Sequence, residues 1–90
     1  MLRRTVRDGV SVRLTVYVRT GCHLCTEMTQ ALERLRHELD FEYTPQVIDA
    51  DPGLVERYGS RVPVLVAGDF EICYYFLEEQ PLREFLRGQV

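Results

Sequence analysis

Hydrophobic and polar positions alternate strictly near the start of the chain. From Val12 to Val18 every second side chain is valine or leucine, and Thr15 and Tyr17 take positions on the opposite side. Alternation with a period of two, rich in β-branched residues, predicts a β-strand. Because both sides of this strand carry apolar bulk, we expect a central strand that is covered on two faces.

The remaining pattern predicts three helices and three more strands, separated by glycine, proline and aspartate. Apolar spacings of three and four indicate the helices, and short apolar runs indicate the strands. In chain order, the expected elements are a helix from about Cys22 or His23 to Leu39, a strand over Phe41–Ile48, a helix over Pro52–Tyr58, strands over Pro63–Ala67 and Phe70–Phe76, and a helix from Glu78 to about Arg87.

This element order predicts an α/β fold of the form β-α-β-α-β-β-α. A strand–helix–strand start implies two parallel strands joined by a right-handed crossover. The tight turn at Gly68-Asp69 makes the last two strands an antiparallel hairpin. Pro45 assigns the second strand to the sheet edge. We therefore expect a four-stranded mixed sheet in the order 2-1-3-4, with helices on both faces.

Length and composition narrow the class of protein. Ninety residues make one domain, for which we expect an N-terminal arm over residues 1–11 and a folded part over residues 12–90. The formal net charge is −3 and no basic stripe is present, which argues against nucleic-acid binding. No apolar run approaches the ~20 residues that span a bilayer, and no signal-peptide pattern is present. We expect a cytosolic monomer without a membrane or nucleic-acid partner.

The segment Gly21-Cys22-His23-Leu24-Cys25 is the strongest chemical signal in the chain. Cys22 follows the predicted central strand and opens a helix, where unpaired N–H groups and the helix dipole favour a thiolate. Cys25 lies one helical turn further on, so its sulfur can reach that of Cys22. Cys22 is therefore the expected nucleophile towards a disulfide, and Cys25 the thiol that resolves the mixed disulfide. Arg19 and a protonated His23 would add positive potential.

A Cys-x-x-Cys pair is also compatible with half of a metal site. Structural zinc needs two further ligands, and the spare candidates are His23, His37 and Cys73. His37 lies about four turns down the same helix, so we rank metal binding below redox chemistry and assign no metal ligand. The sequence leaves open a second class of function, a non-catalytic module that binds a partner or a metal.

The sequence resembles the glutaredoxin-like branch of the thioredoxin superfamily from about Val12 to Leu86. The motif from Arg19 to Cys25 looks like the glutaredoxin active-site segment, and Arg61-Val62-Pro63 looks like its Thr-Val-Pro segment. The resemblance implies a thioredoxin-like, glutaredoxin-type fold and thiol–disulfide oxidoreductase activity. It also implies a cis peptide bond before Pro63 and a backbone contact from Val62 to bound substrate.

Two departures from the glutaredoxin pattern bear on the reductant. His23 and Leu24 stand where glutaredoxins have proline and tyrosine, so the resemblance makes them substrate contacts together with Arg19. The segment from Tyr75 to Glu79 lacks the glycines that belong to the glutathione site of the family. We expect no bound cofactor, a protein or small-molecule disulfide as substrate, and glutathione or thioredoxin reductase as electron donor.

Five other residues are weaker functional candidates. Cys73 is expected to be a small buried hydrophobe on the last strand. Asp49 and Asp51 are expected to cap the short helix that follows them. Arg57 and Arg61 are expected to be solvated surface charges.

Overall fold

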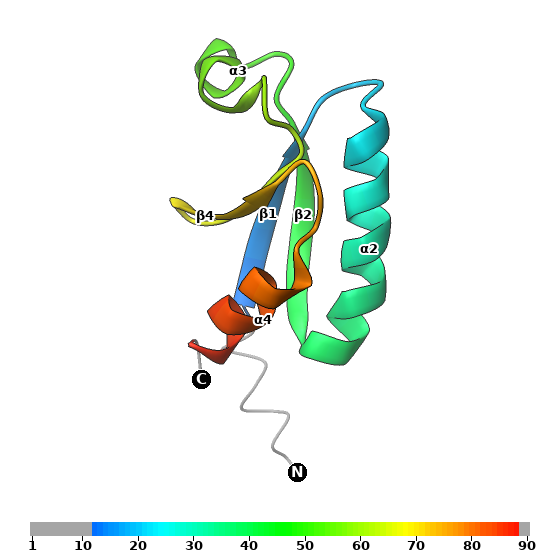
Figure 1. Ribbon diagram of the computed structural model, residues 1–90. Coiled ribbons are helices and arrows are strands. Elements are labelled where there is room, and N and C mark those ends of the chain that lie inside the picture. Colours follow the sequence, from blue (N-terminus) through cyan, green and yellow to red (C-terminus); the bar gives the residue numbers. More distant parts are fainter. Residues whose placement is uncertain (1–11, 89–90) are drawn as a thin grey trace.

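The computed structural model describes residues 12–88, so the arm expected over residues 1–11 lies outside the described part. Four strands and three helices follow one another in the predicted order (Figure 1). Their bounds are β1 Val12–Val18, α2 His23–Leu39, β2 Phe41–Val47, α3 Pro52–Tyr58, β3 Val64–Ala67, β4 Phe70–Tyr74 and α4 Glu79–Arg87. No helix within the described range is long and apolar enough to cross a membrane.

The four strands form one mixed sheet in the order β2-β1-β3-β4, which confirms the predicted order. β1 pairs with β2 in parallel and with β3 in antiparallel, and β3 pairs with β4 in antiparallel. Pro45 pairs with Val16 from the edge strand β2, where a residue without an N–H is tolerated. The central position of β1 explains why both of its sides are apolar.

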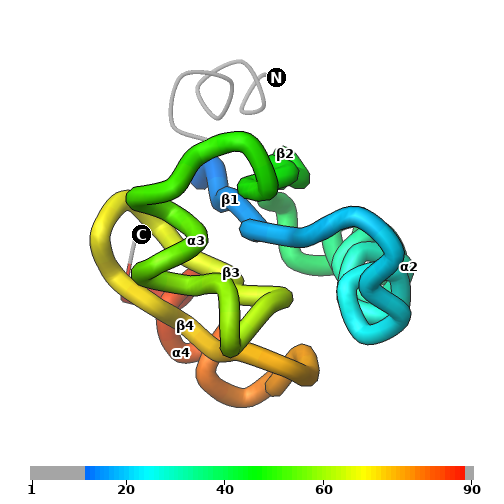
Figure 2. Tube along the Cα trace, turned by 90° about the horizontal axis from the view of Figure 1, so that it is seen from above, coloured from blue at the N-terminus to red at the C-terminus, as the bar shows by residue number. Residues whose placement is uncertain are grey.

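Helices cover both faces of the sheet, as predicted (Figure 2). On one face α2 and α4 bury Met28, Leu32 and Leu82 against Leu14 and Val16 of β1. On the other face α3 contributes to a smaller cluster, whose buried members are Ile48, Tyr58, Val64 and Val66. The alternation of β1 therefore divides the interior into a larger and a smaller core.

The end of β4 differs from the prediction. The apolar run predicts a strand as far as Phe76, but β4 ends at Tyr74 because Tyr75 adopts a left-handed backbone with φ 66°. The N–H of Phe76 then donates to the carbonyl of Tyr74 at 2.7 Å, which closes a tight turn. Glu78 is the extended N-cap residue of α4, so this helix begins one residue later than expected.

Three loops of the chain meet at one end of the sheet. The N–H of Ile48, just after β2, donates to the carbonyl of Val18 at the end of β1 at 3.0 Å. Tyr17 pairs with Val64, so β3 begins where β1 ends. The turn into α2, the loop after β2 and the residues before β3 therefore meet at the carboxyl end of β1.

A substitution at Leu32 tests how much the larger core contributes to stability. Its side chain is fully buried between α2 and the sheet, so Leu32→Ala removes apolar contacts and leaves a cavity. We expect the free energy of unfolding to fall by about 2–5 kcal/mol in urea titration. Arg34→Ala changes an exposed position of the same helix and should stay within about 0.5 kcal/mol of the parent. Equal stability of the two variants would contradict this description of the core.

Candidate active site

Cys22 occupies the N-cap position of α2. Its backbone is extended, with φ −89° and ψ 111°, and its sulfur accepts a hydrogen bond from the N–H of Cys25 at 3.1 Å. A sulfur thus takes the place that a serine or aspartate oxygen usually fills at a helix N-terminus. In the reduced protein the same N–H group and the helix dipole would favour the thiolate form of Cys22.

Cys22 and Cys25 are joined as a disulfide, with their Cα atoms 5.2 Å apart. Cys25 is 4% exposed and packs in the larger core with Met28, whereas Cys22 is half-buried at its margin. Cys22 is therefore the more accessible cysteine of the pair, and Cys25 is enclosed by the core.

An open groove of about 480 Å³ leads to the disulfide. Both cysteines line it together with the turn before α2, the outer side of the first two turns of α2, and Pro45 of the edge strand. The complete set of lining residues is Val18, Arg19, Gly21, Cys22, His23, Cys25, Thr26, Thr29 and Pro45. The hydroxyl groups of Thr26 and Thr29 donate to backbone carbonyls within α2, so this wall is polar but internally bonded.

Asp49 binds Arg19 and Thr20, in the segment that precedes Cys22. Nε of Arg19 donates to its Oδ1 at 3.0 Å, and the N–H of Thr20 donates to its Oδ2 at 3.2 Å. Hydrogen bonds from Thr20 and then Arg19 lower the pKa of Asp49, so the carboxylate is charged at neutral pH. Asp51 caps α3 as predicted, by accepting from the N–H of Leu54 at 3.2 Å. The expectation that Asp49 is also a helix cap was wrong, because β1 and β2 end side by side.

The peptide bond between Val62 and Pro63 is cis, as the resemblance implied. Pro63 is buried directly before β3, and its carbonyl accepts from the N–H of Tyr75 at 2.9 Å. Val62 is half-buried and packs against both cores. Strand register brings this pair to the end of the sheet where Cys22 lies, but neither residue lines the groove described above.

The two residues between the cysteines differ in exposure. The side chain of His23 is 90% exposed, and its Nε2 lies 3.7 Å from Glu27 one turn along α2. Leu24 is half-buried in the same turn. Both therefore lie at the surface next to Cys22 in the chain.

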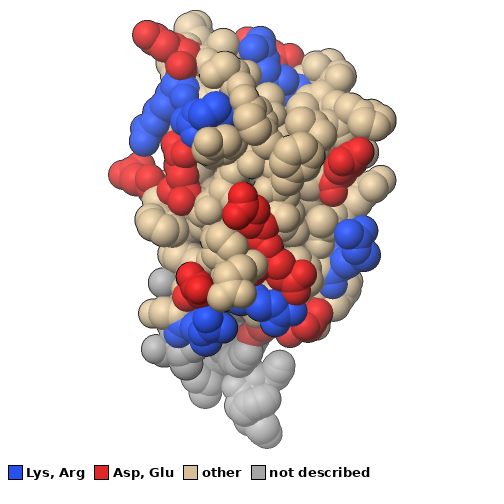
Figure 3. Space-filling model, viewed as in Figure 1, with Lys and Arg blue, Asp and Glu red and all other residues tan. Residues whose placement is uncertain are grey.

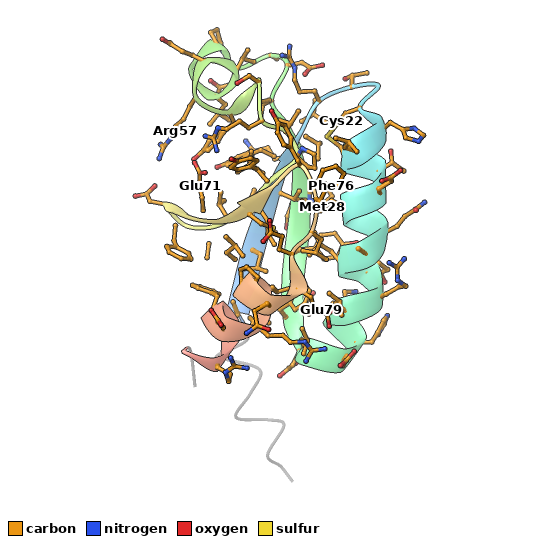
Figure 4. The ribbon with its side chains drawn as sticks, viewed as in Figure 1. Cys22, Met28, Arg57, Glu71, Phe76 and Glu79 are labelled. Atoms are coloured by element: carbon orange, nitrogen blue, oxygen red, sulfur yellow. A yellow bond between two sulfur atoms is a disulfide. The ribbon has the colours of Figure 1, made fainter. Side chains whose placement is uncertain are left out.

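Three consecutive aromatic side chains are exposed at the end of β4. Tyr74, Tyr75 and Phe76 are 46%, 40% and 61% exposed, and each packs edge-on against its neighbour in the sequence. The hydroxyl of Tyr75 donates to the carbonyl of Ser60 at 3.0 Å, which fixes the left-handed turn. Phe76 lies in the loop between β4 and α4 (Figure 4). In Figure 3 the upper central part of this face carries mainly uncharged side chains.

Arg61 is held by neighbours rather than solvated. Its guanidinium binds both carboxylate oxygens of Glu71, at 2.6 and 3.1 Å, and lies over the rings of Tyr58 and Tyr74. The hydrogen bonds from Arg61 lower the pKa of Glu71. The prediction of a solvated charge was therefore wrong for Arg61. Arg57 is exposed and packs over Tyr58, with its guanidinium carbon 5.1 Å from the ring centroid.

Cys73 is the small buried residue that the sequence predicts. It is 8% exposed in the larger core, opposite Leu65, and burial raises the pKa of its thiol. Across residues 12–88 no group of three or more histidine, cysteine or acidic side chains is arranged to hold a metal ion.

A family model described as "Glutaredoxin-like domain (DUF836)" matches residues 13–87 of the chain. The chain belongs to this glutaredoxin-like family. An uncharacterized protein of Mycobacterium tuberculosis is 29% identical over 76 residues, which cover 79% of this chain and 78% of the relative.

Solved structures place the family within the thioredoxin fold. Protein Ne2328 of Nitrosomonas europaea is 41% identical, with a TM-score of 0.74 over 81% of this chain and 88% of that chain. The thioredoxin Deadhead of Drosophila melanogaster is 19% identical, with a TM-score of 0.56 over 98% of this chain and 90% of that one. The predicted thioredoxin-like fold is thereby confirmed for this glutaredoxin-like chain.

Several residues at the site escaped prediction from the sequence. Thr26 and Thr29 line the groove, although only their polar positions on α2 could have indicated it. The Arg19–Asp49 pair joins residues 30 positions apart. The parallel pairing of the first two strands was a usable signal, because it brings the residues after both strands to the same end of the sheet.

A substitution at Gly21 tests the backbone turn directly before Cys22. Its φ is +74°, and a Cβ there would meet no atom within 4 Å, so Gly21→Ala is penalised by backbone conformation alone. We expect the free energy of unfolding to fall by about 1–2 kcal/mol. In the helical setting of Gly53 a Cβ makes only an ordinary contact, and Gly53→Ala should stabilise the protein by about 0.5–1 kcal/mol. Chemical denaturation measures both, and a Gly21→Ala variant as stable as the parent would contradict the turn.

Proposed function

We propose that this glutaredoxin-like protein is a thiol–disulfide oxidoreductase that reduces protein or small-molecule disulfides through Cys22 and Cys25. One observation carries the proposal above the others. The sulfur of Cys22 is the N-cap of α2 and accepts the N–H of Cys25, in a pair already at disulfide distance. A cysteine placed in this way has a stabilised thiolate and a partner within reach.

The proposed reaction has two exchange steps. The Cys22 thiolate attacks one sulfur of the substrate disulfide, forms a mixed disulfide and releases the other substrate sulfur as a thiolate, which takes up a proton. The Cys25 thiol then loses its proton and attacks the sulfur of Cys22. The Cys22–Cys25 disulfide forms and the second substrate thiolate leaves. Two electrons pass to the substrate, and a thiol donor must return two electrons to the pair.

The surroundings of the pair support roles in substrate binding. We propose that a substrate contacts Arg19, His23 and Leu24 around Cys22, and the backbone at Val62 and Pro63. His23 is exposed and Leu24 is half-buried, so both are available to a large substrate. Arg19 lines the groove at the disulfide.

We further propose that the protein acts as a monomer in the cytosol. Of its three cysteines, two pair with each other and Cys73 is buried. No structural disulfide is therefore required, which fits a reducing compartment. Such a compartment also supplies the thiol donors that the proposed cycle requires.

Single-cysteine variants test the two roles. Cys22→Ser should abolish reduction of insulin and of hydroxyethyl disulfide, because the attacking thiolate is gone. Cys25→Ser should instead trap the mixed disulfide at Cys22, visible by mass spectrometry as a covalent adduct. Cys73→Ala is the matched control and should keep the activity, since this thiol is buried away from solvent. Full activity of Cys22→Ser would favour the non-catalytic binding module instead.

The electron donor is tested separately. Tyr75 and Phe76 are bulky, and Glu78 adds negative charge after β4, so this turn disfavours an anionic tripeptide. We therefore expect slower NADPH consumption with glutathione and glutathione reductase than with thioredoxin reductase. Glu78→Gln should raise the glutathione-dependent rate a few-fold, because it removes a like charge. Faster turnover with glutathione in the parent protein would reject this assignment.

A further inference from the structure

Asp49 uses both of its carboxylate oxygens on the two residues that follow β1. Oδ1 accepts from the Arg19 side chain at 3.0 Å, and Oδ2 accepts from the Thr20 backbone at 3.2 Å. Two residues later the chain reaches Cys22. Asp49 therefore binds the short segment that sets both the position of the reactive sulfur and the charge beside it.

Gly59, directly after α3, leaves space for the Arg19 guanidinium. A Cβ placed on Gly59 would lie 3.2 Å from Nη1 of Arg19, so the absence of a side chain there makes room for the guanidinium. Arg19 also lines the groove that contains Cys22 and Cys25. A residue with a cationic side chain thus lines the groove at the disulfide, and its charge is matched by a carboxylate in direct contact.

We propose that Asp49 is a positioning residue that neutralises Arg19 and so keeps Cys22 less reactive than an unpaired Arg19 would make it. The inference rests on the proposed redox role of Cys22. In this proposal the loop after β2 both holds the turn before α2 and lowers the reactivity of the Cys22 thiol.

The physical basis is the difference between a paired and an unpaired charge. Opposite charges 3.0 Å apart act on a distant sulfur as a dipole, whose field falls off faster than that of a single charge. Removing the carboxylate charge leaves the full positive charge of Arg19 beside Cys22. An unpaired cation stabilises a nearby thiolate, whereas an unpaired carboxylate destabilises it.

Other charged groups at this end of the molecule are accounted for by their own contacts. His23 lies near Glu27 on α2, and Arg61 binds Glu71 beyond α3. Beyond these, the loop before α3 carries Asp51, α3 carries Glu56 and Arg57, and Glu78 precedes α4. Asp51 accepts from the backbone of α3, so it offers a carboxylate of the same loop that no Arg19 contact engages.

The experiment measures the pKa of Cys22 from the pH dependence of its labelling by iodoacetamide in the reduced protein, with the label located by mass spectrometry. We expect Asp49→Asn to lower this pKa by about 0.5 units, and Arg19→Ala to raise it by about the same amount. The double variant should return close to the parent value. Asp51→Asn removes the same charge two residues away and should leave the pKa of Cys22 nearly unchanged.

The direction of the two single shifts decides the inference. If Asp49 only holds the turn, Asp49→Asn and Arg19→Ala break the same contact and must shift the pKa of Cys22 in the same direction. Shifts in the same direction, or no shift in either variant, would overturn the inference. Opposite shifts that shrink in 1 M salt would support it, because screening weakens charge effects.

A replacement variant and a separate activity assay complete the test. If Asp49→Asn fails to fold by circular dichroism, Arg19→Lys replaces it: the retained charge should hold the pKa of Cys22 near the parent value, while Arg19→Ala raises it. Equal values for Arg19→Lys and Arg19→Ala would then overturn the inference. Labelling needs no turnover, so failure of this inference is distinct from failure of the oxidoreductase proposal, which the disulfide-reduction assay reports.

Discussion

The hydrogen bond from the N–H of Cys25 to the sulfur of Cys22 is the contact on which the site depends. It satisfies a backbone donor that a helix start leaves unpaired, and it does so with the reactive atom itself. The same hydrogen bond therefore holds the first turn of α2 and the geometry of the cysteine pair. The apolar face that follows, with Met28 and Leu32, anchors this turn to the sheet.

Sheet topology supplies the rest of the site from distant parts of the chain. Because β1 and β2 run in parallel, Arg19 and Asp49 leave the sheet at the same end. Because β3 runs against β1, Pro63 enters the sheet at that end as well. Three loops separated by long stretches of sequence thus meet at the end of the sheet where Cys22 lies, and the central strand β1 determines where they meet.

The fold was predictable because its signals are local and repeated. Alternation in β1, helical spacing in α2 and the Gly68-Asp69 turn each fix one element, and topology rules then fix the strand order. The contact between the two cysteines was predictable because Cys22 and Cys25 are close in the sequence. The Asp49–Arg19 and Arg61–Glu71 contacts were not, since side-chain pairing between loops depends on how far each strand extends. Tyr75 escaped for a related reason, because its left-handed backbone is held by distant carbonyls, those of Ser60 and Pro63.

Pro45 lies in the exposed edge strand β2 and also forms a wall of the groove at the disulfide. An edge strand offers a row of unpaired donors and acceptors to which another chain can add as a further strand. Proline removes one donor from that row, level with Val16 in the centre of the sheet. This missing donor discourages another polypeptide from adding to β2 as a further strand near the Cys22–Cys25 disulfide.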